Sequence, residues 1–480
     1  MTCSLVPMPE SIEMAAGTFI VPPKARWAGN AEARDALEKW LPRPGGTKEA
    51  EARLLLQEDP SRRDLGDEGY ELRIRPAEAR AVARTSAGLL FAAQTLRQLA
   101  AAGAGQMPCC HIVDRPRFSW RGVHLDCARH FLPVHTVLRL LDLSSLHKMN
   151  RFHWHLTDDQ GWRLPVRSRP LLTTVGAPDG LFYSPRDVQK VVARAQELGM
   201  TVIPEIDLPG HMQAAIAAYP ELGCTGVRVP VRRSWGISRY ALNPEPGTVR
   251  FLEEVLDEVL RLFPGPWIHL GGDEVIPVQW KRSRAVQRRM QELGVRTERQ
   301  LQGWFTRHFA QWLSERGRGM IGWDEILEST EGRMPPGTLL MSWRSPRYGI
   351  AAARAGYDVI MTPTTYTYFD YSQSPAGPGL KLIAGQKTAS TLKKVYGYEP
   401  VPDELKGADA ERILGTQGQL WSERIPDQGT LDRQAFPRLC ALSEVCWSPR
   451  AGRSWRSFQE RLPAHLRLLA DLGVRYYGRR

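Results

Sequence analysis

The sequence predicts an α/β protein built as a (β/α)8 TIM barrel, preceded by a small α+β domain and followed by a C-terminal helical tail. Three observations indicate this fold class. From residue 118 onward, short β-rich runs alternate with helical patterns, and eight such pairs occur. The chain has 480 residues, more than the roughly 250–300 that one hydrophobic core supports. No G-x-G-x-x-G pattern follows a strand, which disfavours a doubly wound open sheet.

We therefore expect three parts: an N-terminal α+β accessory domain at residues 1–117, the barrel at 118–445 and a helical tail at 446–480 packed on the barrel. In the first part, residues 69–76 alternate between polar and apolar side chains like a strand, and residues 80–86 could pair with them. Residues 86–101 form an Ala- and Leu-rich helical pattern. The Pro/Gly-rich stretch at 41–53 is typical of a loop.

The barrel segments are defined by β-rich runs and by helix-capping signals between them. The predicted strands are 121–127, 151–156, 201–207, 267–272, 320–326, 338–343, 358–363 and 413–421. Ser184, Pro185 and Asp187 predict the start of one helix, because they supply an N-cap, a proline in the first turn and a capping acid. Thr248 is expected to cap another helix, which Pro264 and Gly265 end.

Composition narrows the function classes. The chain carries 64 basic and 52 acidic residues, a net charge of +12, but no run of five or six basic residues and no nucleic-acid-binding motif, so we expect no nucleic-acid partner. Its seven Cys lack C-x-x-C spacing, which favours reduced thiols over disulfides or a zinc site. No apolar run approaches the roughly 20 residues of a membrane span. The N-terminus lacks the features of a secretory signal, so a cytoplasmic location is expected.

Acidic and aromatic side chains recur where the predicted strands end. In such barrels the C-terminal ends of the strands share one rim, and that rim holds the chemistry. Aromatic rings cover the apolar faces of sugars, Arg, Asp and Glu bind their hydroxyls, and carboxylates are the usual acid, base and nucleophile of glycoside cleavage. Any single acid could be a solvated strand end, but the whole set favours a sugar site. Its members include Asp126, Arg129, Asp158, His211, Asp273, Glu274, Trp323, Trp343, Tyr368, Asp370, Trp421 and Glu423.

The pair Asp273-Glu274 is the most specific of these features. Consecutive residues on a regular strand point to opposite faces, so both can face a pocket only if the strand ends and bends there. Gly271 and Gly272 immediately before the pair supply the required backbone freedom. Two like charges enclosed by aromatic rings should raise the pKa of one carboxyl, as a general acid near neutral pH requires.

Several blocks of the sequence resemble one enzyme family. His269 to Glu274, H-L-G-G-D-E, is similar to the signature of family 20 glycoside hydrolases, the β-N-acetylhexosaminidases. RGVHLDCARHFLP (121–133), KMNRFHWHLTDDQGWR (148–163), TVIPEIDLPGHMQA (201–214), GWDEIL (322–327) and LWSE (420–423) resemble the family's other blocks in order and spacing. The stretch at 70–98 resembles the end of the family's N-terminal domain.

The resemblance implies an exo-acting enzyme that removes terminal non-reducing β-linked GlcNAc or GalNAc from a glycan or glycoconjugate. It implies retention of configuration through an oxazolinium intermediate, with no cofactor and no metal. Glu274 would be the general acid and then the base, Asp273 would orient the acetamido group, and Tyr368 would hold its oxygen. Asp158 and His211 would support the acid, or serve a purely structural role. The implied sugar-binding residues are Arg129, Trp323, Trp343, Asp370, Trp421 and Glu423.

Three other functions remain open from the sequence alone. A non-catalytic sugar-binding relative would keep the same pocket. A metal-dependent amidohydrolase on the same barrel would use His153 and His155, whose H-x-H spacing places both rings on one side of a strand. A polyanion binder would depend on the net charge.

The Gly/Pro-rich segment at 371–412 departs from the family's pattern, which leaves the leaving-group preference open. The sequence does not indicate the oligomeric state.

Overall fold

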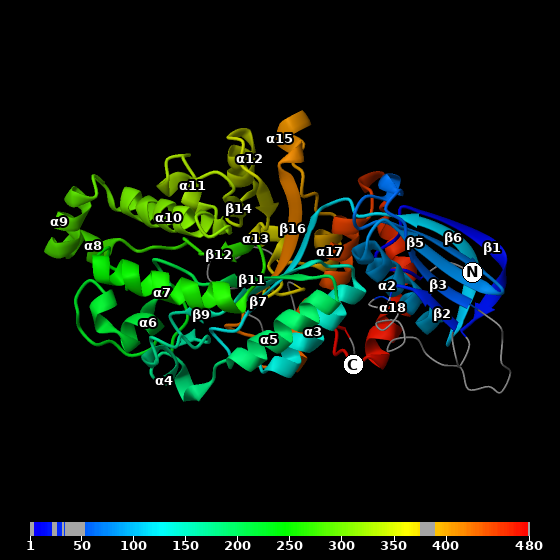
Figure 1. The fold of residues 1–480 in the computed structure, drawn as a ribbon, viewed down its shortest axis with the longest axis horizontal. Helices are drawn as coiled ribbons and strands as arrows, with labels where there is room; N and C mark the ends of the chain where they lie inside the picture. The colour runs from blue at the N-terminus through cyan, green and yellow to red at the C-terminus, as the bar shows by residue number, and fades with distance from the viewer. Residues whose placement is uncertain (1–3, 22–25, 31–32, 34–52, 375–388, 479–480) are drawn as a thin grey trace.

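The computed structural model describes residues 4–21, 26–30, 33, 53–374 and 389–478. Figure 1 shows the N-terminal sheet at one end of the molecule and the barrel at the other. Eight parallel strands close the barrel, as predicted. They are β7 (Trp120–Asp126), β8 (Arg151–His155), β11 (Thr201–Glu205), β12 (Trp267–His269), β13 (Gly319–Trp323), β14 (Leu339–Ser342), β15 (Val359–Met361) and β16 (Ile413–Leu420).

Helices cover the outside of the barrel. The main ones are α3 (Val134–Leu146), α5 (Pro185–Glu197), α7 (Pro246–Leu262), α10 (Glu298–Ser314), α12 (Pro346–Arg354) and α17 (Arg438–Trp447). Shorter elements are α4 (Leu171–Thr174), α6 (Gln213–Ala218), α8 (Val278–Arg282), α9 (Arg284–Glu292), α11 (Glu325–Ser329), α13 (Thr364–Thr367), α14 (Leu392–Tyr396), α15 (Gly407–Glu411), α16 (Gln428–Ala435), and the hairpin of β9 (Thr157–Asp158) and β10 (Gly161–Trp162). Single 3-10 turns lie at Arg63–Leu65, Pro178–Gly180, Pro220–Leu222 and Arg450–Gly452.

Two helix starts test the capping predictions. Ser184 caps α5 through a full capping box: its side chain accepts from the Asp187 N–H, and Asp187 accepts from the Ser184 N–H. The prediction for Thr248 is wrong. Helix α7 begins at Pro246, with Glu245 at the N-cap position, and Thr248 lies in the first turn, where its hydroxyl donates to Asn243 Oδ1 at 2.6 Å.

The N-terminal domain is a six-stranded sheet with one long helix on it. The strand order is β1-β6-β4-β5-β3-β2, and helix α2 (Ser86–Ala102) follows β5. The predicted hairpin is confirmed, because Tyr70 pairs with Ala83 and Arg75 with Glu78. The predicted loop at 41–53 lies outside the described residues except for Arg53. The strands are β1 (Ser11–Ile20), β2 (Arg26–Gly29), β3 (Arg53–Glu58), β4 (Tyr70–Arg75), β5 (Glu78–Ala83) and β6 (Gln106–Asp114).

The chain returns to the N-terminal domain at its C-terminal end. Helix α18 (Trp455–Asp471) packs beside α2, as Figure 1 also shows. The expected boundary between residues 445 and 446 falls inside α17. Within the described residues, no helix is both long and apolar enough to cross a bilayer. The six cysteines that the structure describes are free thiols, and Cys3 lies outside the described residues.

Candidate functional site

A buried carboxylate organises the interior of the barrel below the rim. Glu205, at the end of β11, lies 2.5 Å from Nδ1 of His155 and 2.9 Å from Nδ1 of His269. Trp323 donates its indole N–H to the same carboxylate at 2.9 Å. His153 Nε2 lies 3.0 Å from Glu205, so both histidines of the H-x-H pattern face one acid. These contacts fix the orientation of the His155 imidazole, which in turn contacts Asp158 nearer the rim.

Asp158 connects that layer to the rim. Its Oδ2 lies 2.9 Å from His155 Nε2 and 2.7 Å from Nη2 of Arg129, and its Oδ1 lies 3.2 Å from His211 Nδ1. The Arg129 and His211 charges outweigh burial and hold the pKa of Asp158 well below its usual value. The Arg129 guanidinium lies 4.9 Å from the ring centre of Trp421.

Asp273 and Glu274 follow β12 in the bent conformation that their glycines predicted. Gly271, Gly272 and Glu274 all have positive φ, of 62°, 94° and 48°. His211 Nε2 lies 3.6 Å from Asp273 Oδ2 and 3.5 Å from Glu274 Oε2, so one imidazole faces both carboxylates. The Asp273 side chain is 13 % exposed and that of Glu274 is 31 % exposed. The more open carboxylate is therefore the one that can reach a leaving group.

The raised pKa expected for one of the two carboxyls belongs to Asp273. Burial is the main cause, the charges of Glu274 and Glu205 add to it, and His211 opposes it. Asp207 lies behind Asp273, and its Oδ1 accepts a hydrogen bond from the Gly272 N–H at 3.1 Å. The charge on Asp273 in turn affects Glu325, whose pKa rises to about 9 through burial and through the charges of Asp273 and Asp324.

Aromatic rings and two further acids lie on the opposite side of the rim. Trp343 stacks near Tyr368 with ring centres 6.3 Å apart, and Tyr368 lies 6.4 Å from Trp421. Asp370 and Glu423 are both largely buried, and burial raises the pKa of each. The Glu423 charge also raises the pKa of Asp370, and the Asp126 charge raises the pKa of Glu423.

Several polar atoms around this rim have no hydrogen-bond partner among the residues that the structure describes. Unpaired buried polar groups are costly, so a cluster of them indicates a place where a polar ligand binds. A polyhydroxylated sugar with an amide would supply both donors and acceptors. The atoms are His211 Nε2, Asp273 Oδ1, Asp370 Oδ1, Trp421 Nε1 and Glu423 Oε2.

The structure thus brings the sequence-predicted site residues to the C-terminal end of one barrel. Trp323 lies deepest, with 1 % of its surface exposed, and packs against His153, His269 and Trp421. Trp343 is held differently, because its indole N–H donates to Glu325 Oε2 at 2.9 Å. Of the segment at 371–412, residues 375–388 lie outside the described residues.

Sequence reasoning gave no individual role to several strand-end acids that hold the site together. Asp126 accepts hydrogen bonds from the N–H groups of Ala128 and Arg129, which sets the turn that presents Arg129. Three further acids support site residues in the same way. Glu205 contacts His155, Asp207 lies close to Asp273, and Glu325 accepts a hydrogen bond from the Trp343 indole. Their positions at strand ends were the available signal, but spacing alone does not separate a supporting acid from one that touches a ligand.

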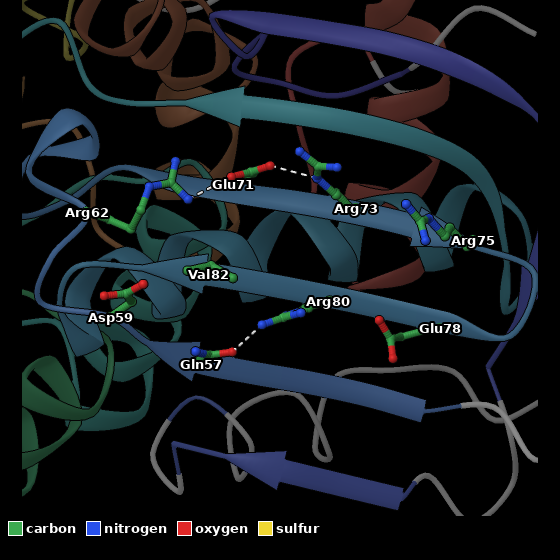
Figure 2. A pocket seen from close by; sticks show the side chains of 9 residues that line it. All are labelled: Gln57, Asp59, Arg62, Glu71, Arg73, Arg75, Glu78, Arg80 and Val82. Carbon is green, nitrogen blue, oxygen red and sulfur yellow. Dashed lines mark hydrogen bonds and ion pairs between the residues drawn. The ribbon is translucent and has the colours of Figure 1, made fainter.

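A second concave surface lies on the outer face of the N-terminal sheet. It is a pocket of about 340 Å³ lined mostly by charged side chains from β4, β5 and the segment that follows β3 (Figure 2). Its central acid, Glu71, is already bonded to Arg62 and Arg73, both at 2.7 Å. Aromatic side chains are absent from its lining, all of which belongs to the described part of the chain. The barrel rim is therefore the candidate active site.

An eight-stranded parallel barrel whose rim combines paired carboxylates with aromatic rings defines a carbohydrate-hydrolase type of site. Comparison with known proteins supports a site of this type. Residues 118–450 match the catalytic domain of glycosyl hydrolase family 20, and residues 2–115 match domain 2 of the same family. The chain belongs to glycosyl hydrolase family 20.

Curated relatives and solved structures support this assignment over nearly the whole chain. A β-hexosaminidase of Porphyromonas gingivalis is 35 % identical over 99 % of this chain and 64 % of its own length. A β-hexosaminidase of Vibrio furnissii is 36 % identical over 92 % of this chain and 76 % of its own length. The chain thus spans just under two thirds of the first relative. The structure of a Vibrio harveyi exo-β-N-acetylglucosaminidase with N-acetylglucosamine is 33 % identical, with a TM-score of 0.86 over 99 % of this chain and 78 % of that one. A β-N-acetylhexosaminidase from Streptomyces coelicolor is 30 % identical, with a TM-score of 0.84 over 100 % and 98 %.

Proposed function

We propose that this protein is an exo-β-N-acetylhexosaminidase that removes terminal non-reducing β-linked GlcNAc or GalNAc by a retaining, substrate-assisted mechanism. The observation that carries the proposal is the placement of Asp273 and Glu274 around one imidazole, on a rim with unpaired polar atoms. The substrate class is supported by the family and by its relatives, among them a β-hexosaminidase and an exo-β-N-acetylglucosaminidase. The acetamido group of the substrate replaces a protein nucleophile, which gains from proximity.

In the first step, the acetamido oxygen attacks C1 of the sugar while the bond from C1 to the leaving-group oxygen breaks. Glu274 donates its proton to that oxygen, so the leaving group departs as a neutral alcohol. Asp273 accepts a hydrogen bond from the acetamido N–H and stabilises the positive charge that develops on the oxazolinium ring. Tyr368 hydrogen-bonds the acetamido oxygen and holds it for attack.

In the second step, Glu274 accepts a proton from water as the water oxygen attacks C1. The oxazolinium ring opens, and the acetamido group is regenerated on a product with the original configuration. Asp158 and His211 act as positioning residues, since His211 contacts both carboxylates and is itself held by Asp158. Arg129, Asp370 and Glu423 bind the ring hydroxyls, and Trp343, Trp323 and Trp421 enclose the acetamido group and the ring face.

A pair of matched substrates tests this proposal. An aryl β-N-acetylglucosaminide should be hydrolysed, whereas the corresponding aryl β-glucoside, which lacks the acetamido group, should be nearly inert. Comparable rates on the two would contradict the substrate-assisted mechanism. Binding of N-acetylglucosamine without hydrolysis of any aryl hexosaminide would instead indicate a sugar-binding relative, and loss of activity on chelation, with the chain still folded at the assay temperature, would indicate the metal-dependent alternative.

A further inference from the structure

Three metal-ligating side chains meet in the core where α3, α17 and α18 come together, apart from the residues of the candidate active site. His147 follows α3 and precedes β8, Cys440 lies on α17, and His465 lies on α18. Nε2 of His147 is 2.8 Å from Nε2 of His465 and 3.3 Å from Sγ of Cys440. All three side chains are at least 98 % buried, with exposures of 1 %, 0 % and 2 %. Neither the proposed reaction nor the sugar site uses them.

The hydrogen-bond pattern leaves His147 ready to act as a ligand. Its Nδ1 lies 2.6 Å from the backbone carbonyl of Leu143, which can only accept, so Nδ1 carries the ring proton and Nε2 carries the lone pair. Metal-bound histidines are held in this way, with the second ring nitrogen donating to a carbonyl.

A metal-free arrangement satisfies this cluster only in part. The single lone pair of His147 Nε2 faces two groups, the His465 imidazole and the Cys440 thiol. The other ring nitrogen of His465, Nδ1, is buried and has no hydrogen-bond partner among the described residues, with or without an ion on Nε2. A bound cation would instead use one lone pair from each of the three side chains, which is the arrangement that their converging donor atoms suit.

We propose that His147, Cys440 and His465 bind a structural Zn²⁺ ion, with a fourth position taken by water or hydroxide. Two imidazole nitrogens and one thiolate are donors that Zn²⁺ prefers, and they exclude Mg²⁺ and Ca²⁺, which require oxygen. As the Zn–S bond forms, the Cys440 thiol loses its proton to solvent. Coordination replaces the hydrogen bond across the 2.8 Å contact between the two Nε2 atoms. The two imidazole rings would therefore move slightly apart.

The position of the cluster indicates what the ion would do. Helix α3 connects β7 to β8, helix α17 follows β16, and β16 pairs with β7 to close the barrel. Cys440 is 293 residues and His465 318 residues away from His147 in the sequence. An ion that joins these three side chains would therefore link the first and last units of the barrel to the C-terminal helix. Such a link stabilises the folded chain without contacting substrate.

Metal content and cobalt spectroscopy test the proposal on the full-length protein. The chain is purified under reducing conditions, treated with a chelator, reconstituted with Zn²⁺ or Co²⁺ and dialysed. We expect one equivalent of metal per chain, a thiolate-to-cobalt charge-transfer band and visible bands of tetrahedral Co²⁺. The melting temperature should rise on Zn²⁺ loading and fall again on chelation. A wild-type chain that retains neither ion and shows no cobalt spectrum would overturn the proposal.

Matched cysteine variants locate the site. Cys440→Ser and His465→Gln should lose the bound metal and the cobalt bands. Cys446→Ser, on the same helix and equally buried but outside the cluster, should keep both. Metal retained by Cys440→Ser, or lost equally by Cys446→Ser, would contradict the assignment. Hydrolysis of an aryl hexosaminide is followed in parallel, so a chain inactive towards that substrate but loaded with one Zn²⁺ would separate this proposal from the proposed function.

Discussion

At the scale of the single residue, Glu274 makes the sharpest prediction. Glu274→Gln should lower the hydrolysis rate by roughly 10²–10⁴-fold for substrates with a poor leaving group, because the departing oxygen then receives no proton. An aryl substrate whose leaving group is stable as an anion should lose far less. Steady-state kinetics over a series of leaving groups measures the difference. A loss that is equal across the series would remove Glu274 from the role of general acid.

A second residue-scale prediction concerns Glu325 under Trp343. Its pKa of about 9 in the folded chain exceeds the ordinary 4.5, so the folded state binds more protons than the unfolded state between these values. Stability contributed by the protonated form is therefore complete below pH 4.5 and is lost as the pH rises towards 9. The loss amounts to at most about 1.4 kcal/mol per pH unit for one group.

Glu325→Gln should remove this pH dependence, because the amide stays neutral and can still accept from the Trp343 indole. The free energy of unfolding, measured with urea at several pH values from 5.5 to 8.5, should fall less steeply in the variant than in the wild type. Glu315→Gln, at an exposed helix end, is the control and should leave the slope unchanged. Parallel curves for wild type and Glu325→Gln would show that Glu325 ionises normally.

At the scale of the element, the end of β12 depends on the absence of a side chain at Gly271. A Cβ there would lie 1.7 Å from Oδ1 of Asp207, so the carboxylate behind Asp273 would have to move. Gly271→Ala should therefore destabilise the fold by about 1–3 kcal/mol and reduce hydrolysis more than 10-fold, since Asp273 and Glu274 follow directly. Thermal denaturation and kcat/KM measure the two effects.

Gly294 separates the steric effect from the backbone effect. It has a similar positive φ of 69°, compared with 62° for Gly271, but nothing lies within 4 Å of an added Cβ. Gly294→Ala should cost only the left-handed backbone term, about 1 kcal/mol, and leave kcat/KM unchanged. If the two variants behave alike, the contact with Asp207 is not what requires glycine at position 271.

The elements show which parts of a barrel are readable from sequence. The eight strands were predictable because short β-rich runs alternate with helical patterns, and Gly271-Gly272 marked the bend at β12. The start of α7 was misplaced because two signals compete there: Pro246 is preorganised for the first turn, while Thr248 is a good N-cap residue. Only the backbone geometry decides between them.

The site is predictable to the extent that parallel strands bring their ends together. Asp158, His211 and Glu274 follow β8, β11 and β12, which are neighbours in the barrel, so their proximity follows from topology. Contacts through tertiary packing are different. The approach of His465 to His147, across 318 residues, leaves no spacing pattern in the sequence.

At the scale of the whole molecule, a buried ion pair joins the N-terminal domain to the barrel. Asp114, at the end of β6, accepts from Lys148 Nζ at 2.7 Å and from Tyr70 Oη at 2.6 Å through one oxygen. Its other oxygen accepts from the Trp447 indole at 2.7 Å. Asp114 is fully buried and the Lys148 side chain is 2 % exposed. A charge held this deeply is stable only while its counter-charge is present.

Asp114→Asn should therefore destabilise the chain by about 3–5 kcal/mol, because it removes one partner of a buried ion pair with the Lys148 ammonium. Lys148→Met combined with Asp114→Asn should recover part of this loss, since neither charge then remains. Arg115→Ala, which breaks the exposed pair of Arg115 with Glu10, is the surface control and should cost about 0–1 kcal/mol. Because the contacts of Asp114 come from both domains, tryptophan fluorescence and circular dichroism should report one shared urea transition in the wild type. Separate transitions for the sheet and the barrel would show instead that the ion pair does not couple them.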